Sequence, residues 1–256
     1  MGTGGATGVG DGTGRLAGNR TRRALEVHWL GRVDYAAAMA LQDDLVRRRR
    51  RGEAPDTLLL LEHPPVITLG RGGDARHVLA GRDELDRRGI ELHETGRGGD
   101  VTYHGPGQLV GYPVLALPPG RRDAHRYLRD LEELLIRAVR GYGVHAGRVA
   151  GLTGVWVGRD KLAAIGVRLA TGWITSHGFA LNVTTDLAGF GAIVPCGISG
   201  RGVTSLARLL GRAPRLEQVA ARVAAQAVAI LGSAPAGRFE RPEPREAIDG
   251  RPVADA

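Results

Sequence analysis

The sequence predicts an α+β domain in which helices flank a mixed β-sheet. Strand-like runs of apolar or alternating residues occur along the whole chain, and helical segments lie among them. Several strand-like runs are separated only by short turns, so neighbouring strands can form hairpins. The order of the elements also lacks the regular strand–helix alternation that builds a purely parallel sheet. Together these observations favour a mixed sheet.

The first half of the chain begins with a strand and a helix. Its first run alternates in polarity, and Asp34 follows as a candidate N-cap for a helix that crosses a row of alanines. The break His63-Pro64-Pro65 separates two further strands, and Gly89 ends a short helix. In chain order, we predict a strand at 25–33, a helix from there to about residue 50, strands at 57–61 and 66–69, a helix at 82–89, and strands at 90–94 and 108–117.

The second half contains a long segment with helical periodicity. Leu128, Leu131, Leu135 and Val139 recur at helical spacing, and the segment closes at Gly143. Three strand-like runs follow, and we interpret the triplet at 159–161 as a turn between two of them. In chain order, we predict a helix at 123–142, strands at 154–157, 162–169 and 173–183, and an amphipathic helix at 216–231.

Composition predicts one folded domain between two tails. The chain has 256 residues and is 43% hydrophobic, which is enough for one large core. Residues 1–21 have almost no large apolar side chain, so burial cannot offset their ordering entropy. Residues 234–256 combine repeated proline with charge. We therefore expect disordered tails at 1–21 and 234–256 and a folded domain at 22–233.

Composition also bears on compartment and partners. The sequence has no run of 18 apolar residues, no basic and apolar leader and one cysteine, so we expect a cytoplasmic protein without a disulfide framework. The formal net charge of +8 favours acidic partners. Nearly all of the basic residues are arginines in a chain rich in alanine and glycine, which also fits a coding bias. Charge alone leaves the partner open.

Lys161 is the only lysine, beside 34 arginines. A guanidinium stays protonated at every relevant pH, whereas an amine can be tuned to release its proton. A chain that uses arginine for its surface cations and still keeps one amine indicates a chemical use for Lys161. The alternative is that Lys161 has no chemical role and is retained by chance in a turn.

Cys196 is the only cysteine and lies between Pro195 and Gly197. A lone cysteine is often a small buried apolar residue, but this one falls in a turn and not within an apolar run. The glycine lets a substrate approach the sulfur and leaves backbone N–H groups for a developing oxyanion. A thiolate needs a nearby cation or base, for which Lys161 and His177 are the candidates.

Residues 97–108 place four glycines around Arg97, Tyr103 and His104. Such a loop can wrap a ligand between fixed polar side chains, or it can simply connect two strands. It has neither the Gly-Lys-Ser/Thr ending of a phosphate-binding loop nor a dinucleotide fingerprint. Its pentapeptide Gly-Arg-Gly-Gly-Asp, at 96–100, also occurs at 70–74. Because the flanking residues do not align, we interpret the two copies of the pentapeptide as two similar loops and not as a repeat.

Small residues are frequent on the two predicted strands between 162 and 183. Ala163, Ala164, Gly166, Gly178 and Ala180 would leave a groove for an alkyl chain, or would allow tight packing against a helix. The eight histidines include no pair four residues apart, and no cysteine pair exists. We therefore expect no metal site.

These segments together resemble the lipoyl(octanoyl) transferases of the biotin/lipoate protein ligase superfamily. The matching stretches are RGGDVTYHGPGQ at 97–108, GVWVGRDKLAAIGVR at 154–168, HGFALNV at 177–183, IVPCG at 193–197 and VTSL at 203–206. The resemblance implies the fold of the biotin/lipoate protein ligase catalytic domain, with 22–233 as the octanoyltransferase catalytic domain.

The resemblance also implies roles for single residues. Cys196 is the expected nucleophile, Lys161 is expected to lower the pKa of that thiol and assist proton transfer, and His177 is a supporting candidate. Neither a cofactor nor a metal is expected. Substrate contacts are expected at Arg97, Gly98, Gly99, Asp100, Val101, Thr102, Tyr103, His104, Ala164, Ile165, Gly166, Gly178, Phe179 and Ala180.

The implied reaction is the first step of endogenous lipoate biosynthesis. Cys196 takes the octanoyl group from octanoyl-acyl carrier protein as a thioester, and the ε-amine of a lysine then accepts it. The acceptors are expected to be lipoyl domains of 2-oxoacid dehydrogenase complexes and the glycine cleavage H protein. A thioester donor makes ATP unnecessary. The resemblance further implies a monomer. From the composition we expect binding to neither nucleic acid nor membrane.

Three other functions stay open on the sequence. An ATP-dependent lipoate or biotin ligase on the same fold would need a nucleotide site and no nucleophilic cysteine. A basic nucleic-acid-binding module is disfavoured, because only 4% of the residues are aromatic and no helix-turn-helix signature is present. A cysteine hydrolase using Cys196 with His177 would release free octanoate when no acceptor is present.

Overall fold

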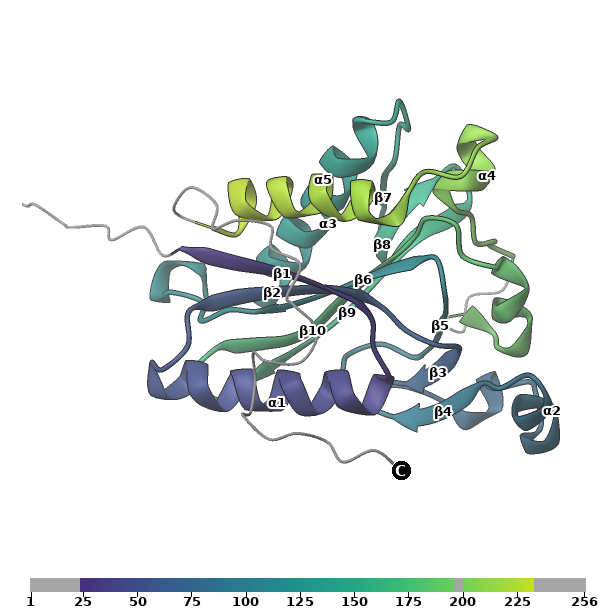
Figure 1. The fold of residues 1–256 in the computed structure, drawn as a ribbon, viewed down its shortest axis with the longest axis horizontal. Coiled ribbons are helices and arrows are strands. Elements are labelled where there is room, and N and C mark those ends of the chain that lie inside the picture. The colour runs from purple at the N-terminus through teal and green to yellow at the C-terminus, as the bar shows by residue number, and fades with distance from the viewer. Residues whose placement is uncertain (1–23, 196–199, 233–256) are drawn as a thin grey trace, which may run out of the picture.

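A computed structural model describes residues 24–195 and 200–232. Within them, a seven-stranded mixed sheet has the order β1-β2-β6-β10-β9-β8-β7 (Figure 1). The pair β1 and β2 is parallel, and all other neighbours in this sheet are antiparallel. The strands are β1 (Leu25–Arg32), β2 (Asp56–Glu62), β6 (Gln108–Val114), β7 (Gly147–Val149), β8 (Leu152–Val157), β9 (Asp160–Ala170) and β10 (Ile174–Asn182).

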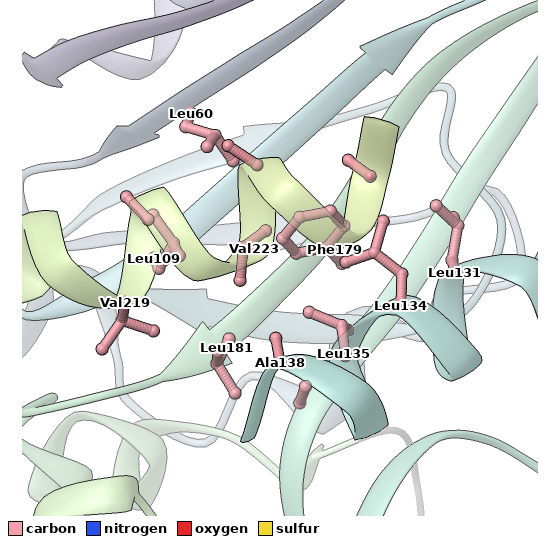
Figure 2. Close-up of a cluster of buried hydrophobic side chains, with 14 of the residues drawn as sticks. Leu60, Leu109, Leu131, Leu134, Leu135, Ala138, Phe179, Leu181, Val219 and Val223 are labelled. Carbon is pink, nitrogen blue, oxygen red and sulfur yellow. The ribbon is translucent and has the colours of Figure 1, made fainter. Parts of the chain in front are cut away.

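Two long helices cover one face of the large sheet. Buried leucines recur at helical spacing in α3 (Ala124–Arg140), and α5 (Leu216–Ile230) adds buried valines and alanines. Figure 2 shows Leu134 and Leu135 of α3 and Val223 of α5 gathered with Phe179 and Leu181 of β10. The main core therefore fixes one side of β10.

The helix α1 (Tyr35–Arg51) covers the opposite face, as Figure 1 shows. Its buried residues Tyr35, Ala38 and Gln42 lie at positions i, i+3 and i+7, so they form one stripe toward the sheet. Ala38 packs in a small core with residues of β2, β6 and β10. This stripe carries a glutamine where packing alone would favour an apolar side chain.

A smaller sheet stands beside the large one, in the order β4-β3-β5. Its strands are β3 (Val66–Leu69), β4 (Glu91–Glu94) and β5 (Val101–His104). Ile67, Val101 and Tyr103 from this sheet share a second apolar cluster with Phe190. The short elements are α2 (Arg82–Arg87), α4 (Leu206–Leu210) and the 3-10 helices η1 (Ala75–His77), η2 (Pro119–Arg121) and η3 (Leu187–Ala192).

The predicted fold class is confirmed, the N-cap position of Asp34 is confirmed, and two local predictions are wrong. Residues 101–104 were expected within a glycine-rich loop but form β5, because Val101, Thr102 and Tyr103 suit a strand and pair with β3. Lys161 is not in a turn: it is the second residue of β9 and is 8% exposed. Asp34 occupies the N-cap of α1, but its side chain makes no capping hydrogen bond.

The predicted tails at 1–21 and 234–256 lie outside the described residues, and so does Cys196. The boundaries of the folded domain therefore stay a prediction. Among the helices of the described ranges, none is long and apolar enough to cross a membrane.

Candidate active site

A cavity of about 210 Å³ lies between β5, β9 and β10, with α1 contributing Tyr35. A cavity of about 150 Å³ in another protein is known to hold benzene, so this one has room for a medium-length alkyl chain. It is lined by Tyr35, Arg97, Gly98, Gly99, Asp100, Val101, Thr102, His104, Val110, Tyr112, Gly151, Leu152, Thr153, Lys161, Ala164, Ile165, Gly166, His177, Gly178, Phe179 and Ala180.

The cavity brings together all but one of the predicted substrate contacts, along with Lys161 and His177. The exception is Tyr103, which is not among the lining residues. Its ring packs edge-on against Phe190 with ring centroids 5.4 Å apart, in the second apolar cluster. Because side chains alternate along a strand, Tyr103 points away from its neighbours Thr102 and His104.

Six lining residues were missed on the sequence. Tyr35, Val110 and Tyr112 come from α1 and β6, where they follow the same apolar patterns as core residues and give no separate signal. The other three, at 151–153, immediately precede the GVWV stretch, so the motif could have been extended to include them.

The small residues of β9 and β10 serve both purposes that the sequence left open. A Cβ at Gly178 would lie 2.1 Å from the Gly111 carbonyl oxygen, and one at Gly166 would lie 2.7 Å from that of Gly98. These glycines therefore allow close backbone packing. Ala164 and Ala180 are paired across the two strands, and both line the cavity. The alanines thus leave the space, and the glycines let its walls approach.

Arg97 is a buried cation beneath the loop that precedes β5. Its Nε and Nη2 donate to Thr68 Oγ1 at 3.1 and 2.9 Å, and Nη2 also donates to the Thr68 carbonyl at 2.5 Å. The side chain is largely withdrawn from water. Thr68 of β3 thereby fixes a permanent positive charge in the cavity wall.

His104 belongs to a buried polar network. Its Nδ1 lies 2.7 Å from Gln108 Oε1, while Gln108 Nε2 donates to the Tyr103 carbonyl and to Asn182 Oδ1. Gln108 therefore offers His104 an acceptor, and Nδ1 carries the proton. Burial, chiefly, lowers the pKa of His104 to about 3, with the nearby His63 acting in the same direction. The imidazole is neutral at physiological pH.

Lys161 is held by backbone on both sides. Its N–H donates to the Gly202 carbonyl at 2.9 Å, and its carbonyl accepts from the Thr204 N–H at 3.0 Å. The amine Nζ lies 4.8 Å from the ring centroid of Trp156, over the ring face. The guanidinium of Arg201 lies 5.2 Å from the same ring. The chain that follows residues 196–199 is therefore anchored to the backbone of the only lysine.

His177 lines the cavity in an unusual backbone conformation. Its φ is 54°, although it lies within β10, and its N–H donates to Gln42 Oε1 at 2.8 Å. Burial lowers the pKa of His177 to about 4, helped by the charges of Arg97 and Arg168. This imidazole is also neutral at physiological pH, so it can accept a hydrogen bond from a substrate.

The residues just before Cys196 are also anchored. The Val194 N–H donates to the His77 carbonyl at 2.7 Å, and His77 Nδ1 lies 2.5 Å from Asp100 Oδ2 in the cavity wall. Cys196 itself lies outside the described ranges. Across the described residues, no group of three or more His, Cys, Asp or Glu is arranged to hold a metal ion.

Known proteins resemble this chain over most of its length. Residues 34–228 match the family model described as lipoyl protein ligase A/B catalytic domain. The octanoyltransferase of Rubrobacter xylanophilus is 58% identical over 193 residues, covering 75% of this chain and 86% of that protein. The octanoyltransferase of Chloroflexus aurantiacus is 55% identical over 206 residues, covering 80% and 92%.

The chain belongs to this family. Within it, the chain is an octanoyltransferase, which is an acyltransferase.

Solved structures of lipoate ligases show the same fold at low identity. Lipoate-protein ligase A, crystallised with ATP, is 20% identical with a TM-score of 0.67, covering 80% of this chain and 85% of that one. A putative lipoate protein ligase from T. acidophilum with bound lipoic acid is 17% identical with a TM-score of 0.66, covering 81% and 86%. The expected mixed-sheet fold of the lipoate protein ligase catalytic domain is therefore confirmed.

Proposed function

We propose that this octanoyltransferase moves an octanoyl group from octanoyl-acyl carrier protein to the ε-amine of a lysine on a lipoyl domain, through a thioester on Cys196. The step would open endogenous lipoate biosynthesis. One observation carries the proposal: Lys161, the only lysine, shares a cavity wall with nearly every residue expected to contact the acyl chain.

The cavity suits an acyl chain that ends in a carbonyl. Apolar side chains of Val110, Ala164 and Ala180 offer contacts to methylene groups. Charged and polar groups, including Arg97, His104 and Lys161, lie in the same wall. A pocket with apolar lining and a few fixed polar groups can bind an alkyl chain and orient its reacting end.

In the first proposed step, the Cys196 thiolate attacks the thioester carbonyl of the carrier-bound octanoyl group. A new carbon–sulfur bond forms, the bond to the phosphopantetheine sulfur breaks, and that sulfur leaves as a thiolate that takes up a proton. Lys161 is the group we propose to supply this proton, because its backbone is bonded to the chain that follows Cys196. Its amine can hold a proton that an arginine could not release.

In the second proposed step, the acceptor amine attacks the acyl-enzyme. An amide bond forms, the Cys196 sulfur leaves as a thiolate, and the attacking nitrogen loses its extra proton to Lys161. After the second step Cys196 is again a thiolate and Lys161 is again protonated, and no ATP is consumed. A thioester-to-amide transfer is downhill, so no further energy source is needed.

We extend the proposal to partners and setting. The donor is acyl carrier protein, and the acceptors are lipoyl domains of 2-oxoacid dehydrogenase complexes and the glycine cleavage H protein. The net charge of +8 supports binding to acidic proteins of this kind. We propose a cytoplasmic monomer.

The decisive experiment is the intact mass of the full chain after mixing with octanoyl-acyl carrier protein, without an acceptor. We expect an octanoyl adduct that maps to Cys196 and disappears when a lipoyl domain is added. Cys196→Ser should form no thioester adduct, and Lys161→Arg should form it at least roughly a hundredfold more slowly, since proton transfer contributes on that order.

Other outcomes identify the rival functions. Octanoylation that requires ATP and survives in Cys196→Ser would indicate a ligase. Rapid release of free octanoate without an acceptor would indicate a hydrolase. Either result would overturn the two-step transfer.

A further inference from the structure

The ladder between β6 and β10 is interrupted at a proline in the middle of the large sheet. Pro113 of β6 has no N–H, and β6 is an interior strand between β2 and β10. Phe179 of β10 is paired with Gly111, so continuing this register by two residues brings His177 opposite Pro113. The regular exchange of backbone hydrogen bonds cannot form at this point.

Side chains replace the missing ladder bonds. Thr175 Oγ1 donates to the Pro113 carbonyl at 2.6 Å and accepts from the Leu115 N–H at 2.9 Å. The N–H of His177 is instead taken by Gln42 Oε1, 2.8 Å away on α1. Both Thr175 and Gln42 are fully buried. The side chains of Thr175 and Gln42 thus form hydrogen bonds with buried backbone groups that would otherwise lack a partner.

The break changes where His177 points. Strand alternation would put its side chain on the same face as Phe179 and Leu181, which belong to the main core. With φ at 54°, the imidazole lines the cavity instead. The only other described non-glycine residue with positive φ is Trp173, in the turn before β10. A left-handed residue inside a strand costs free energy and persists only where its surroundings hold it.

Gln42 has little other reason to be a glutamine. It is 2% exposed on the stripe of α1 that faces the sheet, and its Nε2 has only a 3.7 Å contact with Met39 Sδ. A polar amide at a buried helix position is costly unless its hydrogen bond is needed. Within the described residues, the hydrogen bond from the His177 N–H to Oε1 is the one short hydrogen bond of the Gln42 side chain.

We infer that Gln42 is a positioning residue of the acyl-transfer site, holding His177 in the left-handed conformation so that its imidazole faces the cavity. There the ring lies near the charge of Arg97 and presents a hydrogen-bonding group to the substrate. The effect of Gln42 on catalysis passes entirely through His177. The test uses octanoyl transfer, so it rests on the proposed function.

The first test replaces the acceptor oxygen in an otherwise similar side chain. Gln42→Met should lower kcat/KM for octanoyl transfer roughly ten- to a hundredfold, because displacement of a site residue by an ångström has an effect of that size. Gln42→Glu keeps an oxygen at the same position and should recover most of the loss. Gln218→Met, the same change on an exposed position of α5, is the matched control and should leave kcat/KM unchanged.

The second test separates positioning from a general structural role. His177→Gly removes the imidazole and tolerates a positive φ, so it should lower kcat/KM by itself. Adding Gln42→Met to His177→Gly should then cause no further loss. An equal additional loss in that background would overturn the inference, since Gln42 would then act through the fold, and so would full activity of His177→Gly.

Failure of the proposed function gives a different result. In that case the wild-type chain transfers no octanoyl group under the same conditions. If wild-type transfer is normal and Gln42→Met is as active as wild type, the inference alone is wrong. The thermal unfolding midpoint of each variant shows whether it is folded, and a folded Gln42→Glu variant with the same loss as Gln42→Met would also contradict the inference.

Discussion

The pentapeptide Gly-Arg-Gly-Gly-Asp occurs twice, and its two loops lie against each other. We call residues 70–74 the outer loop and residues 96–100 the pocket loop. The N–H of Arg71 donates to the Arg97 carbonyl at 2.9 Å, and that of Gly72 donates to the Gly99 carbonyl at 3.3 Å. Identical sequences thus meet at one edge of the cavity, where only the pocket loop lines it.

The same residue types have different environments in the two loops. Arg71 is exposed, whereas Arg97 is buried against Thr68. Asp74 caps η1 and pairs with the exposed Arg76, which lowers the pKa of Asp74 to about 2. Asp100 contacts His77 and lines the cavity. The comparison teaches that a short motif gains its chemical role from the strands beside it.

Removing each arginine should give the largest contrast. Arg97→Gln leaves the oxygens of Thr68 without their charged donor, so it should cost about 2–4 kcal/mol of unfolding free energy and lower kcat/KM roughly a hundredfold. Arg71→Gln should stay within about 0.5 kcal/mol of wild type, as exposed substitutions do. Urea denaturation and octanoyl-transfer kinetics measure both. Similar losses for the two variants would break the comparison.

For the first glycine of each loop, Gly70 and Gly96, substitution in the outer loop should cost more stability than substitution in the pocket loop. A Cβ at Gly70 would lie 2.2 Å from the Gly99 carbonyl oxygen, which is backbone, so Gly70→Ala should cost roughly 1–3 kcal/mol. At Gly96, the nearest atom to a new Cβ is the flexible guanidinium of Arg168, at 3.2 Å. Gly96→Ala should therefore be nearly neutral in denaturation. A damaging Gly96→Ala beside a neutral Gly70→Ala would contradict this packing.

Much of the fold could be predicted because periodicity is local. In α3 the spacing of the leucines, and in β2 the continuous apolar run, is enough to predict which residues are buried. The three residues of β7 are too few to show any period. Residues 101–104 were misassigned because the glycines around them dominate the pattern, although Val101 and Thr102 favour a strand.

The site was predictable only where it is continuous in sequence. Its contacts on β9, β10 and the pocket loop lie in contiguous motifs, and nearly all of them line the cavity. Tyr35 and Tyr112 join it through packing of distant elements, which no local pattern records. Tyr103 was misjudged because its facing depends on strand alternation. The conformation of His177 depends on Pro113 and Gln42, which are 64 and 135 residues away in sequence.

Lowering the pH should destabilise the fold, because His177 and His104 become charged near Arg97 of the pocket loop. The pKa of His177 is lowered to about 4 and that of His104 to about 3, against about 6.5 in an unfolded chain. Below pH 6.5 the unfolded state binds more protons than the folded state. The unfolding free energy therefore decreases as the pH is lowered, by about 1.4 kcal/mol per pH unit for each histidine, until the folded pKa of that histidine is reached. Urea denaturation between pH 7 and pH 4.5 measures this slope.

The two arginines sharpen the same test. The charge of Arg97 helps to lower both histidine pKa values, so Arg97→Gln should raise the pKa of His177 above about 4 in an NMR titration of the imidazole. Arg71→Gln should leave it unchanged, since Arg71 is not among the causes of that shift. Equal titration in both variants would show that the charge of Arg97 does not contribute to the lowered pKa of His177.

Neutralising each aspartate should give the smallest contrast. Asp100 Oδ2 contacts His77, and Oδ1 accepts from the Asp74 N–H at 3.0 Å. Asp100→Asn should therefore cost about 1 kcal/mol and lower the thermal midpoint by about 2–4 °C. Asp74→Asn loses mainly an exposed pairing with Arg76, which water and salt already weaken, so its midpoint should move less. Because the His77 carbonyl holds Val194 just before Cys196, Asp100→Asn should also slow octanoyl transfer, whereas Asp74→Asn should not. Equal transfer rates in the two variants would mean that the contact between Asp100 and His77 supports only the fold.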